Sequence, residues 1–329
     1  MTTMAKTNKN AQLSGKRPLR RGSLDASEQG SLTPALFGKF QALIYHEAGI
    51  WLATHKETLL TGRLARRLRL LGLSSMLEYY QLLTQPDQLH ERAMMIDCIT
   101  TNTTHFFREP RHFEFLAQWV FPQWKEQAAA GQRQPRVSVW SAGCSTGEEP
   151  YSLAMTLLKH FPPAIGWDLE LLGTDISTRV LEKARAAVYP IEKSTEIPNQ
   201  YLRAYMLKGT ANHEGIMRVR PEVHKIVRFA RVNLHADSYP ITETFDLIFC
   251  RNVLIYLDER SKQKVLAGLL RQLSPYGLLF VGHSEHLNGT APTLKTIIPT
   301  VYAKVGPDGE HPRHLTRPEP WHDGQFQSY

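Results

Sequence analysis

A loop of small residues, Ser-Ala-Gly-Cys-Ser-Thr-Gly-Glu-Glu-Pro over positions 141–150, stands between an apolar run and an amphipathic segment. Small residues let a backbone approach a bound ligand closely. A P-loop needs a lysine after its last glycine and a dinucleotide fingerprint needs GxGxxG, whereas here Glu148 follows Gly147. A carboxylate would repel a pyrophosphate but suits an ammonium or sulfonium group. We therefore favour S-adenosylmethionine over a nucleotide; the alternative is a tight turn without a ligand.

A second candidate for ligand binding is Asp175, in the segment Leu-Leu-Gly-Thr-Asp-Ile-Ser that ends at Ser177. An acidic residue at the end of the second strand can accept hydrogen bonds from both hydroxyls of a ribose. Asp175 or Ser177 could instead only cap the following helix, because both residue types are favoured at helix N-caps. Ribose binding is favoured over capping alone, because the segment follows the glycine loop by about one strand–helix unit.

Two longer segments combine polar and aromatic residues. The first, Ile99–Pro110, reads ITTNTTHFFREP and separates a helical region from a further predicted helix. The second, Phe245–Asp258, reads FDLIFCRNVLIYLD and is an apolar strand that ends in polar residues. Ligands of parallel sheets bind at the carboxyl ends of the strands, so this polar end lies where a ligand would sit.

The elements that must position these residues alternate between strand and helix. Such alternation predicts an α/β domain with a parallel sheet and helices on both faces. Between Tyr189 and Asn233 the runs His213–Arg220 and Lys225–Arg231 predict a small antiparallel β insert, at about 188–232. The predicted strands are 137–140, 169–173, 245–249 and 278–281, and the predicted helices are 150–160, 177–187 and 259–273.

The part of the chain before this domain is predicted to be helical. Leu60, Leu64, Leu68 and Leu71 recur at helical spacing and form one apolar stripe. Gly72 is a plausible helix stop, and Ser74 or Ser75 can cap the next helix. We therefore predict an all-helical domain over 33–110, a linker helix over 111–130 and the α/β domain over 131–305.

The composition suits a globular protein. Of 329 residues, 42% are hydrophobic, and no apolar run reaches the roughly 18–20 residues that span a bilayer. Three scattered cysteines and the lack of an apolar signal core predict a cytoplasmic location. The net charge of +8 suggests an acidic partner, which could be a nucleic acid, an anionic membrane or a protein. Residues 1–32, which are basic, and 306–329 are predicted to be disordered tails.

The four motifs together resemble the chemotaxis receptor glutamate methyltransferase family, CheR. NTTHFFR, AGCSTGEEPYSLAM, GTDIS and CRNVLIYLD occur in this order, and the resemblance covers about 33–305. It implies a class I S-adenosylmethionine-dependent methyltransferase with a Rossmann-like sheet, a small antiparallel β insert and an N-terminal all-helical domain. One departure is Cys144, where a small residue such as alanine is expected; cysteine is small enough to put little in doubt.

The resemblance also implies roles for the matching residues. Arg108 and Tyr256 match the positions that the family places near the reacting methyl group. The implied cofactor contacts are Asn102, Thr104, Arg108, Glu148, Asp175, Asn233, Leu234, Arg251 and Asn252.

The reaction implied is attack by a glutamate carboxylate on the sulfonium methyl, giving glutamate methyl ester and S-adenosylhomocysteine. A free glutamate has a pKa of about 4.3 and is ionised at neutral pH, so the reaction needs no general base. The site must supply orientation and exclusion of water. His283 and His286 lack a third ligand or an HExxH spacing, so we expect no metal.

The expected partner is a methyl-accepting chemotaxis receptor. Arg63, Arg66 and Arg67 share one flank of a predicted helix and would complement a glutamate-rich receptor helix, although they could be only a solvated face. The β insert could bind a receptor's C-terminal tail by strand addition or could only brace the sheet. We expect a monomer without nucleic-acid binding or direct membrane insertion.

Two other functions stay open. The basic charge would also suit a methyltransferase acting on another protein or on RNA, although Cys250-Arg-Asn-Val stands where an amine site of the Asn-Pro-Pro-Tyr type would be. A non-catalytic, cofactor-binding signalling adaptor is the third possibility. The intact Arg108, Asp175 and Tyr256 count against it.

Overall fold

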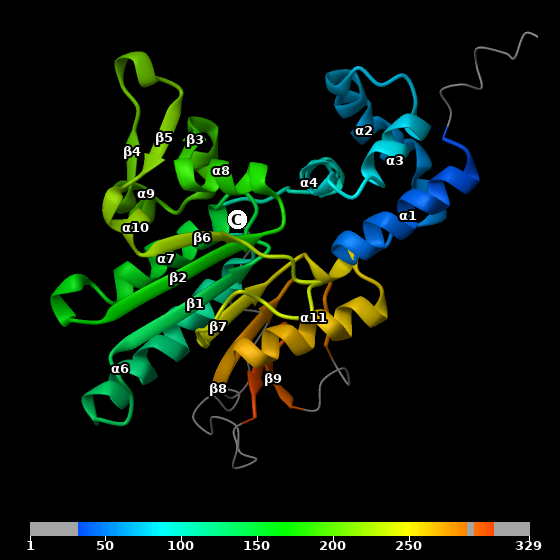
Figure 1. The fold of residues 1–329 in the computed structure, drawn as a ribbon. Coiled ribbons are helices and arrows are strands. Elements are labelled where there is room, and N and C mark those ends of the chain that lie inside the picture. The colour runs from blue at the N-terminus through cyan, green and yellow to red at the C-terminus, as the bar shows by residue number, and fades with distance from the viewer. Residues whose placement is uncertain (1–31, 288–292, 306–329) are drawn as a thin grey trace, which may run out of the picture.

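The computed structural model describes residues 32–287 and 293–305, so both predicted tails, apart from Leu32, lie outside the described residues. The chain begins with a helical domain, which lies beside one end of the α/β domain (Figure 1). Among the described residues, no helix is long and apolar enough to cross a membrane. The helices of the first domain are α1 (Pro34–Ala48), the short 3-10 helix η1 (Thr54–Lys56), α2 (Glu57–Leu71), α3 (Met76–Leu83) and α4 (Leu89–Ile99).

Local sequence signals explain where α2 ends and α3 begins. Leu60 and Leu64 of the predicted stripe are fully buried in the core of the helical domain. Gly72 ends α2 in the left-handed region at φ 68°, a conformation that glycine adopts without steric cost. Ser75 caps α3, with its hydroxyl accepting a hydrogen bond from the backbone N–H of Glu78.

The predicted linker helix packs on the sheet. It is a helical run interrupted by one π-helical turn, and its apolar side chains, Phe121 among them, belong to the core on one sheet face. The run comprises α5 (Pro110–Phe115), the π-helix η2 (Leu116–Val120) and α6 (Phe121–Ala129).

A seven-stranded sheet forms the α/β domain, in the order β6-β2-β1-β7-β8-β10-β9. Neighbours from β6 to β8 pair in parallel, while β10 is antiparallel to both β8 and β9. The predicted fold class is therefore confirmed, with β10 and β9 added by antiparallel pairing beyond β8. The strands are β1 (Arg136–Ala142), β2 (Asp168–Asp175), β6 (Val227–Arg231), β7 (Phe245–Cys250), β8 (Leu273–Val281), β9 (Leu294–Ile298) and β10 (Val301–Lys304).

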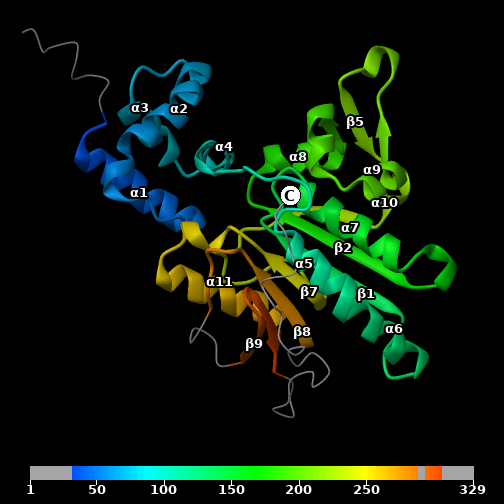
Figure 2. The ribbon, with the colours of Figure 1, turned by 180° about the vertical axis from the view of Figure 1, so that it is seen from behind.

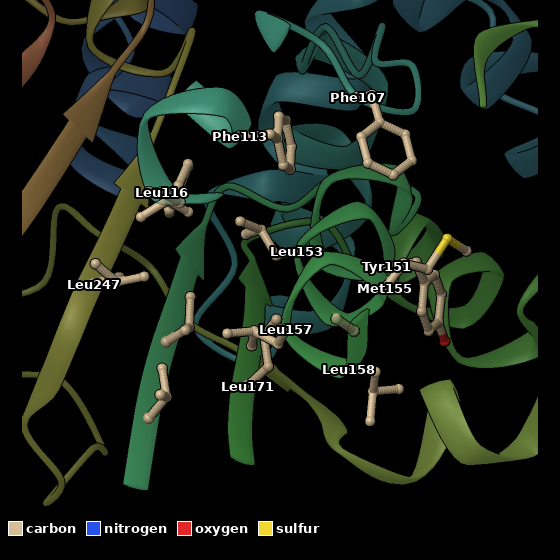
Figure 3. Packing of buried hydrophobic residues seen from close by; sticks show 14 of the residues in the cluster. Phe107, Phe113, Leu116, Tyr151, Leu153, Met155, Leu157, Leu158, Leu171 and Leu247 are labelled. Atoms are coloured by element: carbon tan, nitrogen blue, oxygen red, sulfur yellow. The ribbon is translucent and has the colours of Figure 1, made fainter. Parts of the chain in front are cut away.

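Successive side chains along a strand are buried on opposite faces of the sheet. Val137 and Val139 of β1 pack in the core that includes α7 (Glu148–His160), while Trp140 packs with α11 (Glu259–Gln272). Figure 3 shows Leu153 and Leu157 of α7 with Leu171 of β2, in the same core as Val137 and Val139. Figures 1 and 2, seen from opposite sides, place α11 on one face and α5–α6 on the other. Helix α8 (Thr178–Ala186) joins β2 to the insert.

The small antiparallel insert exists, but one of its predicted strands was assigned wrongly. Its order is β3 (Val188–Pro190), β5 (Ile216–Val219) and β4 (Met206–Lys208). The run Lys225–Arg231 instead supplies β6, which pairs in parallel with β2 in the main sheet. The short helix α10 (Pro221–Lys225) separates the two runs and carries the chain from one sheet to the other. The insert also contains the 3-10 helices η4 (Ile191–Glu196) and η5 (Ala211–His213), and α9 (Asn199–Tyr205).

Candidate active site

A cavity of about 260 Å³ lies where the carboxyl ends of β1, β2 and β7 meet the helical domain. Residues from all four sequence motifs line it, although Ile99 and Leu257, the two farthest apart, are separated by 158 positions. Its walls also include Ala48, the last residue of α1, and Ile50, just after that helix, both from the helical domain. The predicted site residues in the lining are Asn102, Thr104, Arg108, Asp175, Asn233, Leu234, Arg251, Asn252 and Tyr256.

The glycine loop is held against β2 by its backbone. The N–H groups of Gly143 and Cys144 both donate to the carbonyl oxygen of Thr174 at 2.8 Å. Gly143 has φ 84°, and a Cβ atom there would lie 2.4 Å from Cγ2 of Val253, so a larger residue would not fit. Close packing against Val253, which also lines the cavity, therefore explains this glycine.

Asp175 connects the second motif to the glycine loop. Its Oδ2 accepts the N–H of Ser145 and its Oδ1 accepts the N–H of Ser177, both at 2.9 Å. Burial raises the pKa of this carboxyl group, and the two backbone hydrogen bonds oppose that rise. Ser177, not Asp175, is the N-cap of α8, because its hydroxyl accepts the N–H of Val180. Each carboxylate oxygen keeps a further lone pair with which to accept a hydroxyl donor.

The two adjacent glutamates of the first motif point in different directions. Glu148 is absent from the cavity lining; its carboxylate pairs with Lys193 at 2.8 Å and accepts the Thr146 hydroxyl at 2.6 Å. Glu149 does line the cavity. Successive residues of an α-helix point about 100° apart, so only the rotation of α7 decides which glutamate faces inward. The sequence analysis predicts Glu148 as a cofactor contact, whereas the cavity lining contains its neighbour Glu149.

Arg251 is buried and already bonded to protein groups. Its Nε donates to Oε2 of Glu149 at 2.6 Å, and its Nη1 donates to the carbonyl oxygen of Arg108. Nη1 also lies 3.5 Å from the carboxylate of Glu109. Burial, reinforced by the positive charge of Arg251, lowers the pKa of His112 to about 2, so this imidazole is neutral. Arg251 therefore orders the cavity wall as well as lining it.

The third motif forms a loop whose backbone is strained. Phe107 has φ 51° and Glu109 has φ 57°, values that residues other than glycine rarely adopt. Between them Arg108 is half-buried in the cavity wall, with Nη1 donating to the carbonyl oxygen of Thr103 at 3.3 Å. The hydroxyl of Ser145 donates to the carbonyl oxygen of Asn102 at 2.8 Å and so ties this loop to the glycine loop.

The segment that contains Asn233 and Leu234 contacts the helical domain. Asn233 Nδ2 donates to the carbonyl oxygen of Glu47 at 2.7 Å, and Asn233 Oδ1 accepts the N–H of His235 at 3.0 Å. Nearby, the N–H of Trp51 donates to the carbonyl oxygen of Tyr256 at 3.0 Å. The cavity is therefore a site between domains, and its lining includes residues from both.

Two of the three arginines predicted to bind the receptor have partners within the protein. Arg67 forms an ion pair with the buried Glu91, which also accepts the hydroxyl of Tyr79 at 2.8 Å. Arg63 donates to the carbonyl oxygen of Ile99 and to the Thr101 hydroxyl. Arg66 alone of the three is exposed. Of the predicted basic flank, only Arg66 is therefore left for a partner, because Arg63 and Arg67 bind groups within the helical domain.

The lining suits a cationic ligand with a ribose. Asp175 and Glu149 are both buried and contribute carboxyl groups to the cavity, where attraction for a positive charge is stronger than in water; Glu149 is also paired with Arg251. Arg108 and Tyr256 line the same space and could orient an anionic acceptor. Among the described residues, no group of three or more His, Cys, Asp or Glu side chains could hold a metal.

Family models match both domains. The model described as "CheR methyltransferase, SAM binding domain" matches residues 102–303, and "CheR methyltransferase, all-alpha domain" matches residues 35–100. The "Chemotaxis protein methyltransferase" of Escherichia coli (strain K12) is 42% identical over 281 residues, covering 85% of this chain and 94% of the relative. The protein of the same name in Salmonella typhimurium is 40% identical, covering 85% and 93%. "Chemotaxis protein methyltransferase 2" of Pseudomonas aeruginosa is 37% identical, covering 81% and 92%.

Proposed function

Because this chain belongs to the CheR methyltransferase family, and so is an S-adenosylmethionine-dependent methyltransferase of chemotaxis, we propose that it methylates glutamate side chains of methyl-accepting chemotaxis receptors. The products are a glutamate methyl ester and S-adenosylhomocysteine. The observation that carries the proposal is one cavity in which Arg108 and Tyr256 share the walls with Asp175 and Glu149.

The acidic residues and the glycine loop would hold the cofactor. Asp175 would accept the ribose hydroxyls, as its position at the end of β2 allows, and Asn233 and Leu234 would border the adenine. Glu149 would attract the positive charge of the ligand. We assign Glu149 this place in preference to Glu148 because Glu149 lines the cavity, where it also pairs with Arg251, and Glu148 does not line it.

Bound S-adenosylmethionine supplies a methyl group on a sulfonium, and its displacement by a carboxylate oxygen leaves a neutral thioether. Arg108 would orient the incoming carboxylate by charge-assisted hydrogen bonds, and Tyr256 would position the acceptor beside it. No residue has to take a proton, because the glutamate is ionised at neutral pH. The chain's contribution is orientation and exclusion of water, which can supply much of the rate.

Receptor recognition would involve surfaces outside the cavity. Arg66 is the exposed member of the predicted basic flank and would face a glutamate-rich helix. In the small sheet, β4 is an edge strand with exposed Leu207 and Lys208, so an extended receptor tail could add beside it. The reaction would take place in the cytoplasm, where the receptor helices that carry the acceptor glutamates lie.

Transfer of radiolabelled methyl from S-adenosylmethionine to a receptor cytoplasmic fragment tests the proposal. We expect base-labile label on the receptor, as for a methyl ester. Base-stable label, or label on RNA, would contradict it in favour of another methyltransferase. Cofactor binding without any transfer would favour an adaptor.

Arg108→Ala tests the assigned residue in the same assay. Turnover should fall by about 10²-fold or more, because orientation of the acceptor would be lost. Arg228→Ala is the matched control, since Arg228 is half-exposed, pairs with Glu243 and lies outside the cavity lining. Equal turnover of Arg108→Ala and the parent would remove Arg108 from the reaction.

A further inference from the structure

The 3-10 helix η4 of the small insert contacts the backbone of the loop that carries Arg108. Lys193 Nζ donates to the carbonyl oxygen of Thr104 at 3.2 Å. The N–H of Phe106 donates to Oε2 of Glu196 at 2.9 Å. Two residues of the insert thus hold two backbone groups just before Arg108.

Further contacts of the insert surround these hydrogen bonds. The ring of Tyr189, on β3, packs edge-on against Phe106 with ring centres 4.9 Å apart. The Tyr189 hydroxyl donates to the carbonyl oxygen of Thr146 in the glycine loop at 2.9 Å. Lys193 also pairs with Glu148 at 2.8 Å. The insert therefore touches both loops that border the cavity.

The backbone of the Arg108 loop requires such restraint. Phe107 and Glu109 flank Arg108 with φ values of 51° and 57°. A strained backbone of this kind persists only where its surroundings hold it. The α/β domain holds the far end of the loop, where the N–H of Phe107 donates to Ser152 Oγ at 2.9 Å and Arg251 donates to the Arg108 carbonyl oxygen. Lys193 and Glu196 hold the near end.

We infer that Lys193 and Glu196 are positioning residues for Arg108. Neither side chain lines the cavity, so neither is placed to touch the cofactor or the acceptor. They act through the backbone from Thr104 to Phe106, which leads directly into Arg108. A displacement of about 1 Å in an orienting group can cost about 10²-fold in rate. The inference rests on the role proposed above for Arg108.

Turnover of matched variants tests the inference. Glu196→Ala removes the acceptor of the Phe106 N–H, whereas Glu196→Gln keeps an oxygen that can accept it. Lys193→Met keeps the aliphatic stem and removes the donor. Glu192→Ala is the control, because Glu192 is an exposed residue of the same short helix.

We expect kcat to fall about tenfold or more in Glu196→Ala and Lys193→Met, each measured on protein shown to be folded, because Lys193→Met also removes the ionic partner of Glu148. Glu196→Gln and Glu192→Ala should stay within about twofold of the parent kcat. The inference is wrong if Glu196→Ala and Lys193→Met turn over like Glu192→Ala. It is also wrong if Glu196→Gln is as slow as Glu196→Ala, because charge would then matter and the hydrogen bond would not.

Hydrogen–deuterium exchange gives a readout that needs no receptor and no activity. In Glu196→Ala, the peptide containing Phe106 should exchange faster than in the parent, while Glu192→Ala should leave its exchange unchanged. Unchanged exchange in Glu196→Ala would overturn the inference by itself. Failure of the proposed function would instead appear as absence of base-labile label with the parent enzyme, and the exchange result would still decide the inference.

Discussion

The cavity of the α/β domain and the basic flank of α2 show two different outcomes for residues chosen by spacing. In the cavity, residues from four separate motifs converge, because each motif follows a strand or borders the same sheet edge. On α2, Arg63, Arg66 and Arg67 share a flank, yet Arg67 pairs with Glu91 and Arg63 with groups near Ile99. Position at a strand end is a property of the backbone topology. Exposure of a charged side chain depends on partners that are distant in the sequence.

The largest effect that we expect comes from removing Arg251, which pairs with Glu149 and Glu109 at the cavity wall. Arg251→Met would leave Glu149 and Glu109 buried without their cationic partner. Removal of one partner of a buried ion pair typically costs about 3–5 kcal/mol of stability. Urea denaturation should show that loss.

Arg228→Met is the control for this change, since its pair with Glu243 is about half exposed and such pairs contribute about 0–1 kcal/mol. If both variants lose the same small amount, the buried network contributes no more to stability than a surface pair. The contrast between cavity and surface would then be wrong.

The next largest effect is a difference in stability between variants of two neighbouring arginines on α2, Arg67 and Arg66. Arg67→Ala removes the cation bonded to Glu91, which is 6% exposed. We expect a loss of about 1.5–3 kcal/mol in the free energy of unfolding, the range for hydrogen bonds to charged groups. Arg66→Ala should stay within about 0.5 kcal/mol of the parent, as for other exposed positions. Similar denaturation midpoints for the two variants would show that Arg67 is a surface charge after all.

A comparable effect on binding concerns Asp175. Asp175→Ala should weaken binding of S-adenosylmethionine by roughly 1–3 kcal/mol, measured by calorimetry on a variant shown to be folded. Unchanged affinity would contradict the ribose assignment.

The pH dependence of binding sharpens the same test. Burial, with a smaller contribution from Asp97, raises the pKa of Asp175, so the carboxylate is protonated at a higher pH than an ordinary aspartate. Only the ionised form accepts hydrogen bonds through both oxygens, so cofactor affinity should fall as the pH decreases through this raised pKa. Glu149 also lines the cavity and stays in place in Asp175→Asn, which cannot titrate at position 175. If Asp175→Asn keeps the full pH dependence of the parent, another group is responsible.

The smallest effect concerns the remaining basic residue of the flank. Arg66→Ala should raise the apparent KM for the receptor slightly and flatten its dependence on ionic strength, because screening acts on exposed charges over about 8–10 Å. Cofactor affinity should not change, since Arg66 is outside the cavity lining. Replacement of all three arginines would confuse this effect with loss of the Arg67–Glu91 pair. Equal salt slopes for Arg66→Ala and the parent would mean that the receptor docks elsewhere.

The sequence by itself determined the strand–helix alternation, a serine cap for α3 at Ser74 or Ser75, and the end of α2 at Gly72. It also determined which segments border the cavity. All of these depend on hydrophobic periodicity or on hydrogen bonds between residues a few positions apart. The order of segments along the chain then places strand ends together, because parallel strands align their carboxyl ends.

Only the tertiary structure decided that Glu149 faces the cavity and Glu148 faces Lys193, and that the run 227–231 joins the main sheet. It also decided that Glu91 neutralises Arg67 and that Glu196 supports the backbone before Arg108. Each of these depends on the rotation of one element against another, or on a contact between residues 24 to 90 positions apart. Local pattern carries no information on such contacts, because they form only when separate elements pack together.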